Sequence, residues 1–465
     1  MCYNLRHLLS TVEDQVSHHP VPAAFSPIPL KQTLAFWWKL GWISFGGPAA
    51  QIALLHDELV SRRQYLSEHK FLYALNFCML LPGPEAQQLA TYTGYLLHGR
   101  WGGIAAGMLF ILPSLFILVG LAWLYVVFGE TLLLAGLLYG IKPAITVIVL
   151  QAAWRIGSRT LTTTLLRTLA GLALLGSLLH VAFPLLIGLA ALIGWLANRL
   201  MPNQLNTASN PHTLAQQTTQ SSQPKAEPQL WRNFILILLS GLLLWALPML
   251  GLVAWLGLEH PLIQMGWFFT TAALLTFGGA YAVLPYVYQG MVTQYQWLSP
   301  RQMIDGLALG ESTPGPLIMV VTFVAFVAGY QNLMLGADQA LLGGLVAALV
   351  VTWVSFLPSF IFVLAGAPLI ERTQHLPNWS APLKGITAAV VGVIVNLAVF
   401  FALHTLWPSF DQSGFSAAFD GLALALMAVA AWLLFKQHWS ILRVLGVSAL
   451  LGLVGHGISV AGWIG

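Results

Sequence analysis

The 465-residue sequence predicts an all-α polytopic membrane protein, with about 13 apolar segments in two inverted-topology repeats that contain broken or re-entrant helices. Three observations predict this class. Charged residues make up only 7% of the chain, against about 25% in soluble domains. Many apolar runs reach the ~20 residues that a membrane-spanning helix needs. The two halves also share spaced motifs, which a common composition does not produce.

The apolar segments divide the chain into five parts. Residues 1–32 form a cytoplasmic tail that lacks the apolar core of a signal peptide. A first repeat covers 33–200, and a polar, flexible linker covers 201–231. A linking transmembrane helix at 232–256 precedes the second repeat at 257–465. The segments lie near 33–55, 71–98, 102–128, 131–154, 166–182, 183–200, 232–256, 262–288, 302–330, 339–368, 381–405, 418–435 and 440–464.

Composition excludes several other classes. Two cysteines can form neither a disulfide framework nor a thiolate metal cage. The net charge of +4 is small and dispersed, so nucleic acid is not an expected partner. The 13 histidines lack paired ligand spacing, and no GxxxxGK[ST] phosphate loop occurs. We therefore expect no metal, no cofactor and no ATP drive.

The second half of the chain repeats motifs of the first half at a spacing of 232 residues. The shift of 232 aligns residues 45–84 without gaps. Further along the chain, a Leu-Pro-Ser triplet also recurs, at a different spacing. Spaced identities of this kind indicate a duplication. The matched triplets are Phe45-Gly46-Gly47 with Phe277-Gly278-Gly279, Pro82-Gly83-Pro84 with Pro314-Gly315-Pro316, and Leu112-Pro113-Ser114 with Leu357-Pro358-Ser359.

The number of segments predicts how the repeats are oriented. One unmatched helix between two six-segment repeats turns the second repeat upside down, a recurrent design of secondary transporters. The N-terminus is then cytoplasmic and the C-terminus periplasmic, in agreement with the positive-inside rule. The basic residues that this places inside are Arg155, Arg159, Arg167, Arg199, Lys225, Arg232, Arg372, Lys436 and Arg443.

One loop disagrees with a simple zigzag of spans. Such a path would place 56–70 outside, although this loop carries Arg62, Arg63 and Lys70. The alternative is that 33–60 and 71–98 each enter partway, break and return. The sequence favours these re-entrant hairpins, with 56–70 cytoplasmic and 289–301 periplasmic. Whether 166–200 forms one span or two is left open.

Helix-breaking clusters interrupt two apolar segments in each repeat. Proline and glycine destabilise helix interiors, and broken backbone is tolerated in a membrane only against protein or a wet cavity. The free amides at the start of a half-helix attract anions. Ordinary proline kinks are the alternative. The predicted binding residues are Phe45, Gly46, Gly47, Pro48, Pro82, Gly83, Pro84, Glu85, Gln88, Phe277, Gly278, Gly279, Glu311, Thr313, Pro314, Gly315 and Pro316.

Charged residues inside apolar segments are candidates for a charge or coupling role, because they are costly there. Glu85 follows the first Pro-Gly-Pro triplet and Glu311 precedes the second. A role in proton coupling suits them, since burial disfavours the charged form of a carboxyl; a structural cap is the alternative. Lys142 lies inside an apolar run and could attract an anion, whereas Lys384 more readily snorkels to the interface.

These motifs resemble the chromate ion transporter family in its long, two-domain form. The matching stretches are FGGPAAQIALLHDELVSRRQYLSEHKF, LLPGPEAQQLATYTGYLLHGRWGG, the following LPS, TFGGAYAVLPYV with WLS, and GESTPGP. The resemblance covers most of 33–405 and implies a multi-pass carrier in the bacterial inner membrane. Its partners would be chromate or a similar tetrahedral oxyanion and membrane lipid. The second repeat departs from the first, because Ala280 replaces Pro48 and Leu317 replaces Glu85.

The resemblance and the residues together favour secondary active efflux of chromate by alternating access, and no enzymatic activity. A carrier of sulfate or another oxyanion is the first alternative. A membrane-embedded reductase is a second alternative from another class, but the sequence lacks a dinucleotide fingerprint, paired haem ligands and a cysteine cluster. The sequence allows a homodimer without requiring one.

Overall fold

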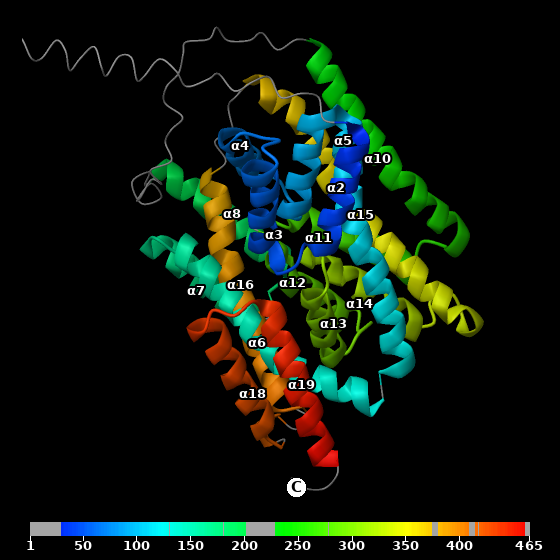
Figure 1. The fold of residues 1–465 in the computed structure, drawn as a ribbon, viewed down its shortest axis with the longest axis vertical. Helices are drawn as coiled ribbons and strands as arrows, with labels where there is room; N and C mark the ends of the chain where they lie inside the picture. Colours follow the sequence, from blue (N-terminus) through cyan, green and yellow to red (C-terminus); the bar gives the residue numbers. More distant parts are fainter. Residues whose placement is uncertain are drawn as a thin grey trace, which may run out of the picture.

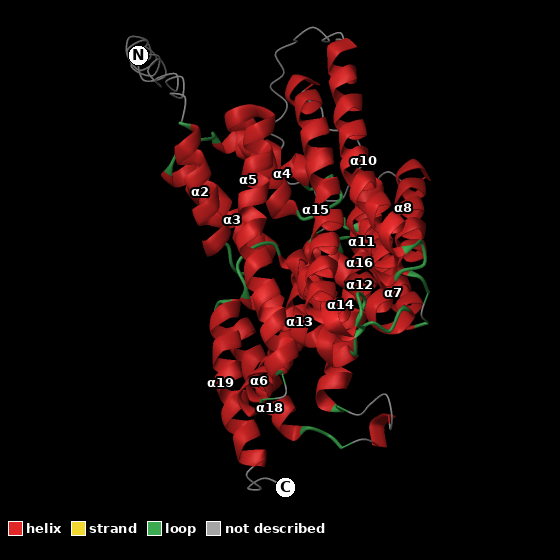
Figure 2. Cartoon of the chain, turned by 90° about the vertical axis from the view of Figure 1, so that its right-hand side faces the viewer, coloured by secondary structure: helices red, strands yellow, loops and turns green. Residues whose placement is uncertain are grey.

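The computed structural model describes residues 29–129, 131–179, 181–200, 228–277, 279–373, 380–408, 414–416 and 418–460. Within these ranges every regular element is a helix (Figures 1 and 2). Most of the expected N-terminal tail and polar linker lies outside the described residues, as does Gly278. The linking helix begins at Pro228, four residues before the predicted start.

Six helices are long and apolar enough to cross a membrane, and five shorter helical stretches are also apolar. The number of crossings stays a prediction. The long helices are α5 (Glu85–Phe128), α6 (Leu132–Thr160), α8 (Phe183–Leu200), α10 (Pro228–Leu256), α15 (Ala340–Thr373) and α16 (Ser380–Leu406). The shorter stretches include α7 (Thr164–Leu178), α11 (Pro261–Leu275), α14 (Val320–Gln331), α18 (Gly421–Ala431) with η6 (Trp432–Lys436), and α19 (Ile441–Val460).

The predicted segment 33–55 is two helices that double back. Helix α2 (Leu30–Ile43) ends before the first break, and α3 (Gly47–His56) continues into η1 (Asp57–Arg62). The Arg63 guanidinium, just beyond η1, lies 4.7 Å from the centre of the Phe36 ring, midway along α2. The chain therefore folds back along α2 after the first break. Neither α2 nor α3 reaches the length of a span.

The next segment also folds back on itself. Helix α4 (Glu68–Cys78) ends before Pro-Gly-Pro, and α5 begins directly after it. Within α5, His98 and Gly99 leave the helical conformation. A Cβ atom built on Gly94 would lie 2.6 Å from the Gly102 carbonyl oxygen, so the two arms of α5 pack tightly against each other. This turn lies where the sequence placed the boundary between 71–98 and 102–128.

The second repeat has the same broken pattern. Two π-helices, η1 and η2, are 232 residues apart, and each is followed by a glutamine with positive φ, 52° at Gln64 and 53° at Gln296. The remaining elements are α12 (Ala280–Tyr288), η2 (Gln289–Gln294), α13 (Pro300–Ser312), η3 (Leu317–Met319), η4 (Ala337–Gln339) and η5 (Gly414–Ser416).

The last two helices of each repeat pack against a long helix of the other repeat. Helices α18 and α19 contact α6, while α7 and α8 contact α16 (Figure 1). Glycines permit these contacts, since small residues let helix backbones approach closely. A Cβ on Gly140 of α6 would lie 2.7 Å from Gly452 Cα of α19. Helix α10 lies at the periphery and packs mainly on α15.

Candidate functional site at the helix breaks

The break between α2 and α3 requires glycine. Gly46 and Gly47 have φ angles of 91° and 75°, in the left-handed region. Residues with a Cβ atom avoid this region, whereas glycine adopts it at little cost. Pro48 follows in the first turn of α3, where its missing amide hydrogen costs no helical hydrogen bond. The sequence thus fixes where the helix stops and where the next one begins.

The four breaks form two cross-repeat pairs. The Gly83 amide donates a hydrogen bond to the Thr276 carbonyl, and the Gly315 amide donates one to the Ser44 carbonyl, each at 2.7 Å. These bonds are equivalent under the 232-residue shift. Each Pro-Gly-Pro triplet therefore binds the Phe-Gly-Gly break of the opposite repeat. The breaks that the sequence predicted separately meet in the interior of the protein.

The Leu-Pro-Ser triplets support the same arrangement. A Cβ atom built on Gly83 would overlap the Ser359 hydroxyl, and one built on Gly315 would lie 2.6 Å from Ser114 Cβ. Each Pro-Gly-Pro triplet thus packs against the serine of the other repeat's Leu-Pro-Ser triplet. Gly83 and Gly315 have φ angles of 130° and 102°, so a side chain would also strain the backbone there.

Two buried glutamines stabilise the breaks. Gln88 donates from Nε2 to the Pro82 carbonyl at 2.8 Å. Gln51 donates to the carbonyls of Ser44, at 3.3 Å, and Gly315. Gln88 was predicted from its place after Pro-Gly-Pro, whereas Gln51, one helical turn after the first break, was missed.

Several buried polar atoms near the breaks have no hydrogen-bond partner among the described residues. They include Ser44 Oγ, Ser114 Oγ, Glu311 Oε2 and the Oε1 atoms of Gln51 and Gln88. An unsatisfied buried polar group costs about 1–3 kcal/mol. Such a cluster is expected where a wet cavity or a polar solute lies, since either one supplies the missing partners.

The two carboxyls predicted from the sequence are connected to half-helix starts of the opposite repeat, Glu85 directly and Glu311 through the Tyr281 hydroxyl. Glu85 is half-buried, and its Oε1 lies 3.8 Å from a Cβ position built on Gly279, just before α12. Glu311 is 4% exposed and accepts a hydrogen bond from the Tyr281 hydroxyl. That hydroxyl lies 3.7 Å from a Cβ position built on Gly47, at the start of α3. Tyr281 was missed, because its equivalent in the first repeat is Ala49 and no motif marks it.

The remaining predicted residues lie around these contacts. Phe45 and Phe277 are half-buried, and each amide donates to the carbonyl two residues earlier, at 3.1 and 3.0 Å. Thr313 is buried and its hydroxyl donates to the Gly310 carbonyl at 3.0 Å. Helices α3, α5 and α12 and the turn η3 all begin at the breaks. Their free amides give the region a positive electrostatic potential.

Lys142 has a different environment from the one the sequence suggested. Its Nζ forms an ion pair with Asp305 Oδ1 at 3.1 Å, and the Tyr125 hydroxyl donates to Asp305 Oδ2 at 3.0 Å. The exposed fractions of Lys142 and Asp305 are 9% and 2%. The lysine charge is neutralised within the protein. Asp305 and Tyr125 carry no sequence signal that would have paired them with it.

No group of three or more His, Cys, Asp or Glu side chains suited to a metal ion occurs in the part of the chain that the structure describes. The contacts at the breaks consist of backbone amides, hydroxyls, amide side chains and two carboxyls. Hydrogen-bond donors beside helix N-termini are typical of anion recognition.

Comparison with known proteins assigns the chain to a family. The family model for chromate transporters matches residues 31–195 and 263–453. Similar proteins include a chromate transport protein of Pseudomonas aeruginosa, 30% identical over 92% of both chains. One from Cupriavidus metallidurans is 28% identical over 92% of this chain and 93% of its own. A probable chromate transport protein of Synechococcus elongatus is 29% identical over 81% and 86%. No solved structure matches significantly. The chain is a multi-pass membrane protein that belongs to the chromate transporter family.

Proposed function

We propose that this protein exports chromate across the bacterial inner membrane, as a secondary active transporter with alternating access. The family consists of transporters, not enzymes, which removes the reductase alternative. Three relatives with coverage above 80% carry chromate transport in their names. Chromate is a tetrahedral divalent oxyanion, and the chemistry at the breaks suits such a solute.

The reciprocal hydrogen bonds between the breaks are the main support for this proposal. The bonds from Gly83 to Thr276 and from Gly315 to Ser44 join two half-helix pairs of opposite repeats. In an inverted-repeat transporter the substrate binds where such discontinuous helices meet, with positive helix ends aimed at anionic groups. The equivalence of the two bonds under one shift supports inverted repeats. We place the oxyanion among these breaks, within reach of the helix-start amides and the buried hydroxyls.

The two repeats are proposed to contribute differently to the site. Glu85 has no carboxylate counterpart in the second repeat, and Glu311 has none in the first. Both carboxyls would repel a dianion when charged. Their proposed role is therefore to exchange protons during the cycle, so that substrate movement and proton movement are coupled.

Uptake of labelled chromate into everted membrane vesicles tests this function. We expect time-dependent uptake that exceeds that of vesicles without the protein and depends on an ion gradient. Competition by unlabelled sulfate distinguishes a chromate transporter from a sulfate transporter. Stronger competition by sulfate than by chromate itself would favour the sulfate carrier, and no uptake under any gradient would contradict the proposal.

Substitution of the break glycines tests the location of the site. Gly47→Val should abolish uptake at matched protein level, because valine cannot adopt a φ of 75° without strain and would crowd the start of α3. Gly279→Val makes the same comparison in the second repeat. The matched control is Gly120→Val on α5, where nothing lies within 4 Å of the added Cβ. Unchanged chromate affinity and flux in Gly47→Val would exclude this break as part of the site.

A further inference from the structure

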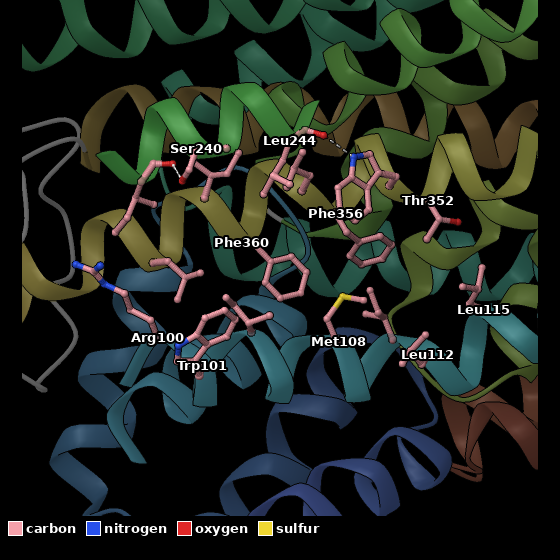
Figure 3. Close-up of a pocket in the computed structure, with 18 of the residues that line it drawn as sticks. Arg100, Trp101, Met108, Leu112, Leu115, Ser240, Leu244, Thr352, Phe356 and Phe360 are labelled. Atoms are coloured by element: carbon pink, nitrogen blue, oxygen red, sulfur yellow. Dashed lines mark hydrogen bonds between the residues drawn. The ribbon is translucent and has the colours of Figure 1, made fainter. Parts of the chain in front are cut away.

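A long apolar groove lies on the outside of the helix bundle, and the described break residues do not line it. It has a volume of about 570 Å³ and lies between α5, α10 and α15 (Figure 3). Phe356 and Phe360 of α15 and Met108 of α5 occupy its middle, while Leu244 of α10 borders it from the opposite side. All three helices are apolar enough to cross a membrane, so the groove faces the lipid region.

The groove has one charged end. Among the described residues that line it, Arg100 is the one that carries a charge, and it lies beside Trp101 at one extremity (Figure 3). Trp101 is 80% exposed and Arg100 is also exposed. In the described parts of the chain, no acidic side chain forms an ion pair with Arg100. Exposed Trp and Arg at the end of an apolar helix are typical of the membrane–water interface.

Arg100 lies at the same end of the molecule as the basic loop 56–70. It follows the turn at His98, whose Nε2 is 2.8 Å from the Thr33 hydroxyl near the start of α2. Arg63 of that loop contacts Phe36, one helical turn further along α2. With the orientation favoured by the positive-inside rule, this end faces the cytoplasmic leaflet, which carries anionic lipid.

We propose that the groove binds one acyl chain of an anionic phospholipid, with the lipid phosphate against Arg100. The α5 wall from Arg100 to Leu115 rises about 22 Å at 1.5 Å per residue. One acyl chain reaches about half of a hydrocarbon core that is ~30 Å thick, so the groove accommodates it fully. A cation at the mouth of an apolar groove between transmembrane helices selects an anionic headgroup.

The bound chain would touch helices that also build the central site. Leu112 and Leu357, from the two Leu-Pro-Ser triplets, line the groove. Ser114 and Ser359 of the same triplets contact Gly315 and Gly83. Lipid in the groove therefore packs against the turns of α5 and α15 that fix the Pro-Gly-Pro breaks. This inference does not depend on which anion is transported.

Native mass spectrometry of the purified full-length protein, titrated with phosphatidylglycerol or phosphatidylcholine, tests the proposal. Wild-type protein should retain one phosphatidylglycerol in preference to phosphatidylcholine. Arg100→Gln should weaken phosphatidylglycerol binding about fivefold, the contribution of one basic residue near an anionic headgroup. Arg159→Gln on α6 is the matched control, because it removes an exposed arginine that does not line the groove.

A second variant tests binding of the acyl chain without changing the charge of Arg100. Ser240 is an exposed lining residue of α10, and Ser240→Phe should obstruct the groove and reduce binding of both lipids. Equal retention of the two lipids by wild-type protein would overturn the proposal. So would unchanged phosphatidylglycerol binding in Arg100→Gln and Ser240→Phe, or a dimer that buries the groove in place of lipid.

Discussion

Replacing Lys142 by methionine should destabilise the folded protein more than most single substitutions. The ammonium group is paired with Asp305 at 3.1 Å, and the two side chains are 9% and 2% exposed. Without the lysine, the carboxylate keeps the hydrogen bond from the Tyr125 hydroxyl but loses its ion-pair partner. Removing one partner of a buried pair costs about 3–5 kcal/mol, because it leaves an uncompensated charge in a low-dielectric interior.

The double variant Lys142→Met/Asp305→Leu distinguishes pairing from packing. Replacing both partners of a buried pair by apolar residues of similar volume is often neutral, so the double variant should recover most of the lost stability. Thermal stability is measured by size-exclusion chromatography of detergent-solubilised protein after heating. Lys70→Met is the control, because Lys70 is exposed. The reasoning would be refuted if the Lys142→Met protein denatured at the same temperature as the wild type. It would also be refuted if the double variant were less stable than either single variant.

Three further outcomes are expected. Gly83→Ala should lower chromate uptake at least tenfold, since a Cβ would overlap Ser359 and the φ of 130° adds ~1–3 kcal/mol of strain; Gly120→Ala should leave uptake unchanged. Glu85→Gln should reduce uptake more than expression at every pH from 6 to 8 (roughly the physiological range), because an amide cannot exchange a proton. In a chain without its native cysteines, Gln64→Cys should resist a membrane-impermeant thiol reagent in intact cells, whereas Gln296→Cys should react.

A specific result would contradict each of these three predictions. Wild-type flux in the alanine variant at Gly83 would mean that the cross-repeat contact is not needed for transport. Wild-type uptake in Glu85→Gln across the pH range would make the carboxyl charge dispensable. Labelling of position 64 from outside would place the basic loop in the periplasm and reverse the proposed orientation.

The sequence determined the class of the protein and the positions of its helix breaks. Apolar runs interrupted by Phe-Gly-Gly and Pro-Gly-Pro predicted broken helices, and the structure ends helices at these motifs. The prediction succeeded because the cause is local: proline lacks an amide hydrogen, and glycine adopts backbone angles closed to other residues. The turn at His98 was likewise predicted as a segment boundary.

Only the tertiary structure decided which groups meet. The Gly83–Thr276 bond, the Tyr281 hydroxyl on Glu311 and the pairing of Lys142 with Asp305 join residues from 30 to 193 positions apart. Helical periodicity indicates which residues share a face of one helix, but it carries no information on which face of another helix lies opposite. That choice depends on how all the helices pack together, because a buried polar group is stable only where a partner from another segment satisfies it. Local backbone chemistry therefore determines where the helices break, and the packing of the two repeats determines which partners meet there.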